Sequence, residues 1–328
     1  MKKILATLLT LIMVLGCTSA LASTESYTFK WAEVNPAEHL MSLSAKEFGA
    51  ALEQVSGGRM KIELYPAMVL GDEANTLLLL QMGECDFFRG NAVSMADFGA
   101  NKMSTLALPF IFQSREHLWS VLESEVGDEI LANVEDSGSG MVAVGWFEEG
   151  ARHFFFNKKP VATLADMAGM KIRVSQNEMS MDIVRAFGAS PTPISYSELY
   201  TSLQTGVIDG AENPAVGYES NSFYEVSPYF TYGGYSYTPS PVLMSEMVWN
   251  KLDEEDRGLI KEAIAIAQAW NKENAKSNEE AALARAEAKG CIVTQADVSE
   301  FVEASKPVYE KYGANQGELI ETIQSMVP

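Results

Sequence analysis

The feature that most constrains this chain is a single helical pattern over Asp253–Lys289, 37 residues that no proline interrupts. Its first turn, residues 253–256, is entirely acidic and suits the positive end of a helix dipole. Gly290 supplies the stop signal. At a rise of 1.5 Å per residue such a helix is about 55 Å long. That length exceeds the diameter of one small domain, so we expect the helix to bridge two lobes.

The first half of the chain alternates strand and helix signals, which favours an α/β fold. Strands are predicted near Tyr27–Ala32 and Met60–Pro66, with an amphipathic helix over Leu40–Val55 between them. Two further helices are predicted over Asp72–Met82 and residues 115–134. The valine-rich run Met141–Phe147 is typical of a buried strand in a largely parallel sheet.

A second cycle of strands and helices begins near Gly150. Strands are predicted over residues 153–157, 170–174 and 207–209, and the tyrosine-rich segment Tyr229–Tyr237 is predicted to be a loop. Ser195 and Glu198 have the spacing of a capping box ahead of a short helix. The 328 residues are enough for two domains of ordinary size, each with its own core.

The N-terminus has the pattern of an export signal. Lys2 and Lys3 precede the apolar run Ile4–Leu15, which is too short to span a bilayer. Ala20–Ala22 forms a cleavage site, and residues 1–22 are predicted to be the signal peptide. A lipobox-like sequence ending at Cys17 leaves a lipid anchor as the alternative. Either pattern predicts a periplasmic protein.

Charge and cysteine content limit the classes of partner. The formal net charge is −20, or −22 once Lys2 and Lys3 are removed, which argues against binding to nucleic acid. An anionic ligand stays possible, because distant surface charges are screened over about 8 Å at physiological salt. Cys85 and Cys291 have two possible states, a disulfide in an oxidising compartment or buried free thiols, and we favour the thiols.

Sequence signatures of catalysis are not found. The three histidines, His39, His117 and His153, form no HExxH motif or metal-ligand cluster, and the chain has no G-x-S-x-G, P-loop or G-x-G-x-x-G sequence. Among 44 acidic residues a pair of carboxylates can meet by chance, so a glycosidase-like enzyme remains an alternative. We predict a protein that is not an enzyme and has no cofactor or metal.

Arg173 is the most informative single residue. It lies in the strand sequence M-K-I-R-V, where Ile172 and Val174 should face the core and Arg173 the opposite side. An arginine flanked by buried apolar residues needs a partner, because a buried charge without one is costly. That partner is either a carboxylate of the protein itself or a ligand.

Several segments carry a resemblance to a known family. They include S-G-G-R, L-Y-P, L-G-D-E and G-A-S-P-T-P, together with G-W-F-E-E-G-A-R-H at 145–153 and L-Q-T-G-V-I-D-G-A-E-N-P at 203–214. The chain resembles the DctP-type substrate-binding proteins of TRAP (tripartite ATP-independent periplasmic) transporters. The resemblance implies a two-lobed, periplasmic-binding-protein-like α/β fold with a long helix spanning both lobes and a ligand cleft between them. It also implies integral membrane transporter subunits, driven by a sodium gradient, as partner.

The resemblance assigns ligand contacts in the second lobe. Arg173 matches the arginine that clamps a carboxylate, and Arg152 matches a second arginine near the ligand. Asn213, in A-E-N-P, matches an asparagine that hydrogen-bonds the acid end. Tyr196 matches an aromatic position of the cleft, although packing at a helix start is an equally simple role for it.

The first lobe is expected to determine which acid is bound. Glu73 and Asn91 match polar ligand positions of sialic-acid-type members, but an acid is usual at the place of Asn91. Arg89 resembles an arginine of members that bind uronates. Glu33 follows the first strand, where a polar group should face the ligand. Glu33 and Glu73 would accept from sugar hydroxyls or, alternatively, are solvated loop carboxylates.

We therefore predict a monomeric periplasmic receptor for a small organic acid, first a uronate or related sugar acid and next a hydroxy or keto acid. A ligand sensor that serves a signalling receptor is the alternative. Lobe I should comprise residues 26–149 and about 239–278, and lobe II residues 150–238 and about 279–328.

Overall fold

The computed structural model of the protein describes residues 25–328. The predicted signal peptide and the lipobox at Cys17 lie outside these residues. Within them, no helix has both the length and the apolar character needed to cross a bilayer.

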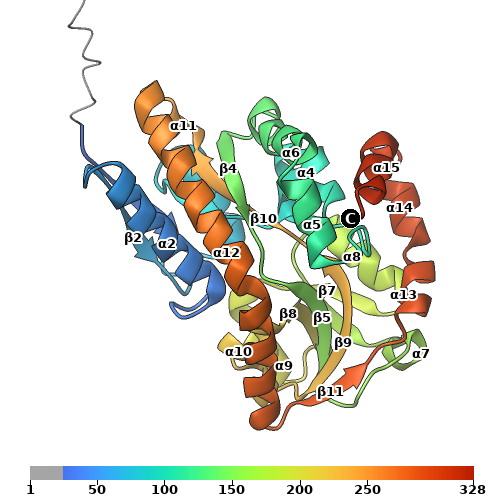
Figure 1. Ribbon diagram of the computed structural model, residues 1–328. Coiled ribbons are helices and arrows are strands. Elements are labelled where there is room, and N and C mark those ends of the chain that lie inside the picture. The colour runs from blue at the N-terminus through green and yellow to red at the C-terminus, as the bar shows by residue number, and fades with distance from the viewer. Residues whose placement is uncertain (1–24) are drawn as a thin grey trace, which may run out of the picture.

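Two mixed sheets form the centres of two lobes (Figure 1). The first sheet has the order β2 (Met60–Tyr65), β1 (Tyr27–Ala32), β3 (Phe87–Arg89), β10 (Ser240–Ser245) and β4 (Met141–Phe147). The second has the order β11 (Ile292–Gln295), β9 (Tyr229–Tyr237), β5 (Ala151–Phe156), β8 (Gly210–Pro214), β6 (Lys171–Val174) and β7 (Ser190–Pro193). The predicted α/β class and two-lobed fold are confirmed.

Each sheet is parallel except for one strand. In the first sheet β10 runs antiparallel to both of its neighbours, β3 and β4. In the second sheet β5 runs antiparallel to β8 and β9. These two strands are the ones that enter from the other lobe: β5 follows β4 after residues 148–150, and β10 follows β9 after residues 238–239. The two crossings made by strands therefore leave one reversed strand in each sheet.

The long helix predicted at residues 253–289 is confirmed as α12 (Glu254–Ala288), with the Asp253 carboxylate capping its first turn. Figure 1 shows α12 running alongside both lobes, and it packs against α2 (Leu40–Val55) in one and α10 (Ala215–Ser220) in the other. Midway, the buried Asn271 side chain accepts from the Glu148 amide at 2.8 Å and donates to the Glu148 carbonyl at 3.1 Å. The helix is thus fastened to the β4–β5 crossing.

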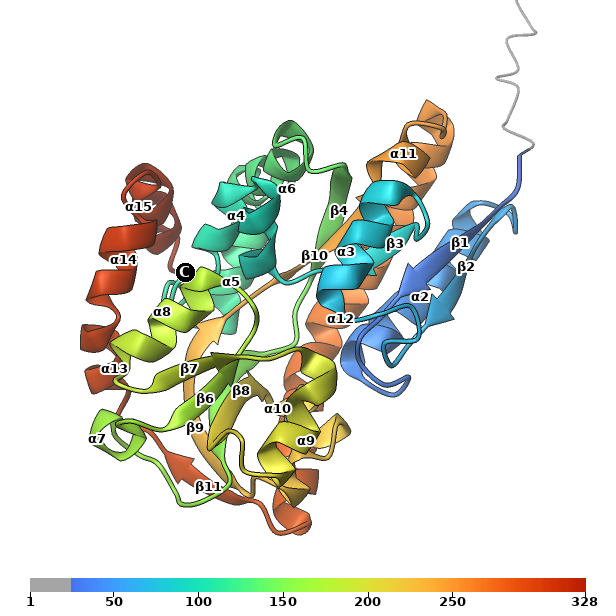
Figure 2. The ribbon, with the colours of Figure 1, turned by 180° about the vertical axis from the view of Figure 1, so that it is seen from behind.

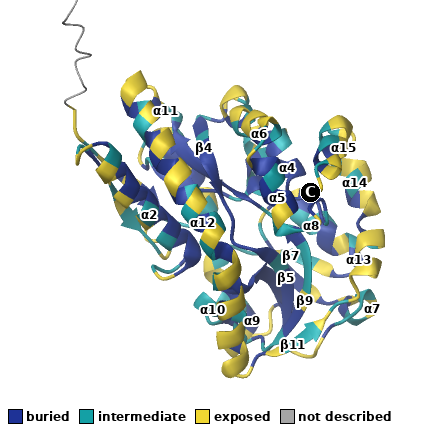
Figure 3. Cartoon of the chain, in the orientation of Figure 1, coloured by how far each residue is buried: buried dark blue, intermediate teal, exposed yellow. Residues whose placement is uncertain are grey.

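Most of the remaining helices pack around the two sheets (Figure 2). Figure 3 shows the pattern expected of such a layer, with buried residues turned toward the strands and exposed residues on the outside. These helices are α3 (Glu73–Met82), α4 (Asn101–Thr105), α5 (Arg115–Leu122), α6 (Glu125–Asp136), α7 (Leu164–Met167), α8 (Glu178–Ala186), α9 (Leu199–Gln204), α11 (Glu246–Trp249), α13 (Val298–Ala304), α14 (Lys306–Tyr312) and α15 (Gly317–Ser325), with 3-10 turns η1 (Ala92–Phe98), η2 (Tyr196–Glu198) and η3 (Phe223–Glu225).

Aromatic residues build a core in each lobe. In the first, the Trp31 ring stacks on Phe87 with 5.6 Å between centroids. In the second, Phe155 packs on Tyr218 at 4.9 Å, which in turn packs on Phe230 at 4.9 Å. Offset and tilted pairs of this kind add about 0.5–1.5 kcal/mol each beyond area burial.

Three local predictions are wrong. The helix predicted over 115–134 is two helices, because Ser124 accepts from the Val126 amide and starts α6 anew. The predicted tyrosine-rich loop is β9, where tertiary pairing with β5 and β11 overrides the Gly233-Gly234 breaker signal. Residues 207–209 are not a strand, and β8 begins at residue 210.

The structure also tests the predictions for the Ser195 hydroxyl and for the two cysteine thiols. The Ser195 hydroxyl donates to the Glu198 carboxylate at 2.8 Å and does not cap the backbone as predicted. Cys85 and Cys291 are both buried and free, which confirms the favoured alternative.

The C-terminal helices touch both lobes. α14 packs on α8 of the second lobe, whereas α15 packs on α4 of the first. A ring nitrogen of His117 in α5, Nε2, lies 2.7 Å from the Ile323 carbonyl oxygen in α15. The C-terminal segment is therefore shared between the lobes, and their residue boundaries remain a prediction.

Candidate functional site

A polar cavity between the two sheets collects the residues that the sequence singled out. It encloses about 40 Å³, and we call it the inner cavity. Of the eight candidate residues all but Glu33 line it, and Glu33 contacts Arg89 directly behind it. The lining residues are Val34, Asn35, Glu73, Arg89, Asn91 and Glu149 from the first lobe and the crossing, and Arg152, Arg173, Ser175, Tyr196 and Asn213 from the second.

Arg173 lies on β6 with its side chain turned into this cavity. Ile172 and Val174 on either side are buried, as the alternation predicts, and Arg173 itself is only 4% exposed. Its Nε donates to the Ile194 carbonyl oxygen at 2.9 Å. Among residues 25–328 no carboxylate forms a salt bridge with it, and its terminal nitrogens make no hydrogen bond. Burial lowers the pKa of Arg173 below its ordinary value, although a guanidinium remains charged at neutral pH.

Arg152 differs, because it already has a carboxylate partner. On β5 its Nε forms a salt bridge with Glu212 of the neighbouring strand β8. The Tyr235 hydroxyl donates to the same Glu212 oxygen at 3.1 Å. Burial by itself raises the pKa of Glu212, but the charge and hydrogen bond of Arg152 outweigh burial and lower it. Arg152 is thus held in place before any ligand arrives.

Arg89 on β3 lies between two carboxylates. Its Nη2 and Nε donate to Glu33 at 2.9 and 3.1 Å, and its Nη1 pairs with Glu149 at 2.7 Å. Glu33 also accepts from the backbone and side-chain nitrogens of Asn35 at 2.9 and 3.0 Å. This network of one arginine and two carboxylates is buried, so it fixes the wall of the cavity and carries a net negative charge.

Glu73 and Asn91 form a pair at the first-lobe side. The Asn91 backbone and side-chain amides donate to the two oxygens of Glu73 at 2.9 and 2.7 Å. Glu73 is the first residue of α3, and both residues are half-buried and line the cavity. A carboxylate at position 91 would instead repel Glu73 at this distance.

Asn213 and Tyr196 are joined across the second lobe. The Tyr196 hydroxyl accepts from the Asn213 side chain at 2.9 Å and from that of Asn221 at 3.0 Å. Because both acceptor positions are used, its own proton is available to donate into the cavity. Burial raises the pKa of Tyr196 to about 12, so the phenol keeps this proton at neutral pH.

Sequence reasoning missed the carboxylates that hold the arginines. Glu149 lies in the crossing segment G-W-F-E-E-G, and Glu212 in A-E-N-P. Both stand inside segments that were already recognised. The signal that could have identified Glu149 and Glu212 is that an arginine within a buried strand needs a carboxylate partner.

A second polar cluster lies away from the cavity and links the β4–β5 crossing to α12. Arg115 pairs with Glu148 at 2.7 Å and with Glu279 of α12 at 2.6 Å. His153 Nε2 lies 3.6 Å from the other Glu279 oxygen. Within the described residues no group of three or more His, Cys, Asp or Glu side chains could hold a metal ion.

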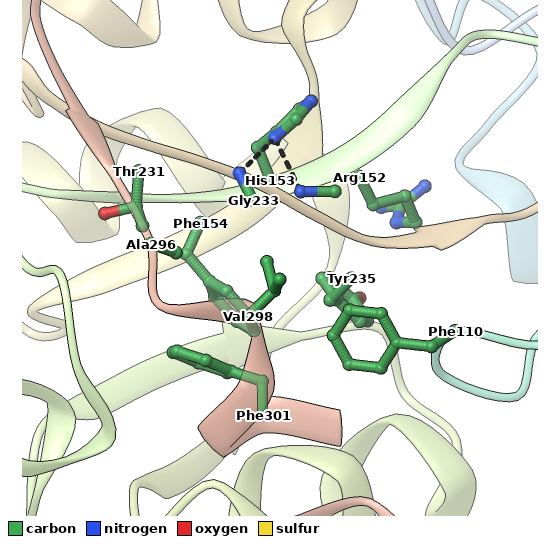
Figure 4. A pocket seen from close by; sticks show the side chains of 11 residues that line it. Phe110, Arg152, His153, Phe154, Thr231, Gly233, Tyr235, Ala296, Val298 and Phe301 are labelled. Carbon is green, nitrogen blue, oxygen red and sulfur yellow. Dashed lines mark hydrogen bonds between the residues drawn. The ribbon is translucent and has the colours of Figure 1, made fainter. Parts of the chain in front are cut away.

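A small apolar cavity lies behind Arg152 (Figure 4). His153 accepts at its Nδ1 from the Gly233 and Gly234 amides, at 3.2 and 3.1 Å, and Phe301 of α13 closes the opposite side. With about 10 Å³ it has room for no more than about one water. It is not a solute site.

The comparisons with known proteins agree with this geometry. The model of the family described as bacterial extracellular solute-binding protein, family 7 (DctP), matches residues 31–316. The sialic acid-binding periplasmic protein SiaP of Vibrio cholerae is 29% identical over 282 residues, covering 84% of this chain and 85% of SiaP.

Two solved structures are similar throughout. A TRAP periplasmic solute-binding protein from Bradyrhizobium in complex with galacturonate has a TM-score of 0.88 at 34% identity, covering 91% of this chain and all of that one. Another from Pseudomonas putida F1, with bound D-glucuronate, has a TM-score of 0.87 at 31% identity, covering 90% and 96%. This chain belongs to family 7 of the bacterial extracellular solute-binding proteins, the receptors of TRAP transporters.

Proposed function

We propose that this receptor binds a hexuronate, such as galacturonate or glucuronate, between its lobes and delivers it unchanged to sodium-coupled TRAP membrane subunits. The observation that carries the proposal is Arg173, a buried guanidinium with no carboxylate partner among the described residues. The named ligands of the two similar structures support the choice of acid.

The carboxylate of the solute would complete the coordination of Arg173. A guanidinium presents two parallel N–H donors that match a planar carboxylate. Each charge-assisted hydrogen bond contributes about 1.5–3 kcal/mol, and more in a cleft without water. Arg152 lies on the same side of the cavity, while Asn213 and Tyr196 supply oriented donors to the acid end.

The sugar hydroxyls would form hydrogen bonds mainly with residues of the first lobe. Glu73 and Asn91 offer acceptors and a donor that hold each other in position. Arg89 holds Glu33 and Glu149 in position through its two ion pairs. These contacts come from one lobe and the arginine clamp from the other, so a bound acid would favour the closed arrangement over an open one.

A hydroxy or keto acid is the second candidate class, because the carboxylate clamp does not require a ring. A signalling partner is the second candidate for the receptor's role. We expect the protein to act as a periplasmic monomer, with removal of the signal peptide favoured over a lipid anchor at Cys17.

A thermal-shift screen followed by calorimetry tests the ligand class. Galacturonate, glucuronate, a small hydroxy acid, and neutral galactose as matched control would each be added to the purified protein. Ligand at 100 times its dissociation constant adds about 2.7 kcal/mol to the free energy of unfolding. Stabilisation by galactose with none by any carboxylate would overturn the proposal. Recovery of the ligand unchanged, checked by NMR, separates a receptor from an enzyme.

A further inference from the structure

A loop of the first lobe is bonded to the second lobe at a point apart from the two strand crossings. The loop, residues 106–114, joins α4 to α5, and both helices pack on α6, which packs on β4 of the first sheet. The Phe110 backbone amide donates to the Tyr235 carbonyl oxygen on β9 at 2.8 Å. The Tyr309 hydroxyl on α14 donates to the Pro109 carbonyl oxygen, also at 2.8 Å. Both polar atoms of one peptide group are therefore bonded to elements of the second lobe.

The ring of Phe110 contacts the second lobe as well. It lines the small apolar cavity behind Arg152 together with Phe154, Tyr235 and Phe301 (Figure 4). The rings of Phe154 and Tyr235 are stacked, with 4.9 Å between their centroids. Because the cavity encloses only about 10 Å³, these side chains fill almost all of the space behind Arg152.

The backbone of Phe110 is strained. Its φ angle is +59°, in the left-handed region that a bulky side chain seldom adopts. Such a conformation costs free energy and persists only where the surrounding contacts compensate for it. The two hydrogen bonds of the Pro109–Phe110 peptide group are contacts of this kind, and separation of the lobes would break both. They therefore stabilise the arrangement of the lobes in which they form.

Tyr235 connects this contact to the solute site. Its carbonyl oxygen accepts from Phe110, and its hydroxyl donates to the Glu212 carboxylate at 3.1 Å. Glu212 in turn forms the salt bridge with Arg152. A chain of bonds thus runs from the first lobe through Tyr235 to an arginine of the cavity, and a shift of Tyr235 would move the carboxylate that holds this arginine.

We infer that the Pro109–Phe110 peptide group is a latch, which holds the two lobes in the arrangement of this structure, and that Tyr235 is a positioning residue, which links the latch to Glu212 and Arg152. The latch slows release of the solute, because the solute can leave only when the lobes separate. This inference rests on the proposed function and extends it from the identity of the solute to the control of closure.

Three variants of the full mature chain test the latch. Phe110→Gly removes the ring but suits a left-handed backbone, so the fold should be retained. We expect glucuronate to bind about tenfold more weakly and to dissociate about tenfold faster, as measured by calorimetry and stopped flow. Tyr309→Phe removes only the hydroxyl bonded to Pro109 and should weaken binding about threefold. Tyr312→Phe is the matched control with no expected effect, because its hydroxyl donates to Asp182 of α8 at 2.7 Å.

The distance between the lobes gives a readout that loss of stability alone would not change. Dyes can be attached at Glu53→Cys on α2 and Lys159→Cys before α7, whose native side chains are 51% and 50% exposed. The native Cys85 and Cys291 are buried. By single-molecule FRET, Phe110→Gly should show a larger open fraction than the wild type, both without ligand and with saturating glucuronate.

Tyr235→Phe tests the link to the arginine. It keeps the ring and the carbonyl oxygen that accepts from Phe110, but it loses the bond to Glu212. Glucuronate affinity should fall about threefold, while the open fraction of the ligand-free protein stays as in the wild type. Unchanged affinity would overturn the positioning role of Tyr235.

The failures are distinguishable. If neither glucuronate nor galacturonate binds the wild type, the proposed function is wrong, and the open fraction of the ligand-free variants still decides for or against the latch. If glucuronate binds and Phe110→Gly changes neither its affinity nor the open fraction, the latch is wrong and the uronate proposal stands. The same holds if Tyr312→Phe weakens binding as much as Tyr309→Phe does.

Discussion

The Nε of Arg173 donates to the carbonyl oxygen of Ile194 at 2.9 Å, and this is the single hydrogen bond of that guanidinium to the described residues. The contact fixes the side chain without neutralising it. Arg89 and Arg152, in the same cavity, are each paired with carboxylates. Two of the three arginines of the cavity are paired and the third is not, which supports our proposal that Arg173 holds an anion.

Replacing Arg173 separates binding from folding. Arg173→Lys keeps a charge but loses the parallel donors, so we expect uronate affinity to fall at least thirtyfold, about 2 kcal/mol. Arg173→Met removes a buried charge that has no partner, so the free energy of unfolding should be unchanged or higher. Calorimetry and urea denaturation measure the two effects. Arg185→Lys, on the surface of α8, is the control, and unfolding of either Arg173 variant would point to a structural role instead.

Loss of one partner from the Arg152–Glu212 pair should lower the free energy of unfolding, in contrast to the loss of Arg173. Glu212→Ala leaves Arg152, whose side chain is 17% exposed, without its carboxylate. Removing one partner of a buried pair costs about 3–5 kcal/mol of unfolding free energy, and we expect a loss near the lower end of that range. The double variant Arg152→Met with Glu212→Met should recover most of that loss, because it removes both charges. A denaturant-based double-mutant cycle measures the coupling, and additive effects of the two changes would contradict it.

Gly217 should affect ligand affinity because its backbone lies against the Asn213 side chain. A Cβ at Gly217 would lie 2.6 Å from the Asn213 side-chain oxygen, so Gly217→Ala must displace the amide that Tyr196 holds. We expect uronate affinity to fall about tenfold, or about 1.4 kcal/mol. Gly258→Ala in α12 is the matched control. Its Cβ would meet no atom within 4 Å, and it should stabilise the helix by about 0.5–1 kcal/mol. Normal binding by Gly217→Ala would show that Asn213 tolerates movement.

Asp182 predicts a pH dependence of stability. Its carboxylate on α8 accepts from Lys311 at 2.5 Å and from Tyr312 at 2.7 Å, both on α14. Burial opposes ionisation, but these bonds and Arg185 lower the pKa of Asp182 to about 2. A lowered pKa stabilises the folded state fully above the unfolded value of about 3.9, and this contribution is lost as the pH falls toward 2.

The Tm difference between the wild type and Asp182→Asn should therefore be constant from pH 7 to about 5 and shrink between about pH 4 and 2. Asp136→Asn, at an exposed residue, should show no such change. A difference that stays the same down to pH 2 would assign the stabilisation to hydrogen bonding that the amide retains.

Local patterns in the sequence predicted most of the secondary structure. The bounds of α2 and β4 agree with prediction, and α12 begins after its predicted cap at Asp253. Such elements depend on side-chain period, caps and stop signals, all of which lie within a few residues of each other. Where a distant strand supplied the stabilisation, as for β9, the local signal was misleading.

The candidate site shows the same division. Strand alternation placed Arg173 opposite the core, and recognised segments singled out the other seven residues. No local pattern indicated which charged residues form ion pairs. Glu33 lies 56 residues from Arg89, and Glu212 lies 60 residues from Arg152. Those pairings exist because each sheet brings strands that are distant in sequence side by side: β1, which Glu33 follows, lies beside β3, and β5 lies beside β8.

The sequence by itself determined an α/β chain with a helix too long for one lobe and an arginine on the non-core face of a strand. Only the tertiary structure decided that Arg89 and Arg152 are neutralised while Arg173 is not. The reason is physical: burial and alternation are local properties of a strand, but the energy of a buried charge depends on groups that folding brings within a few ångströms of it.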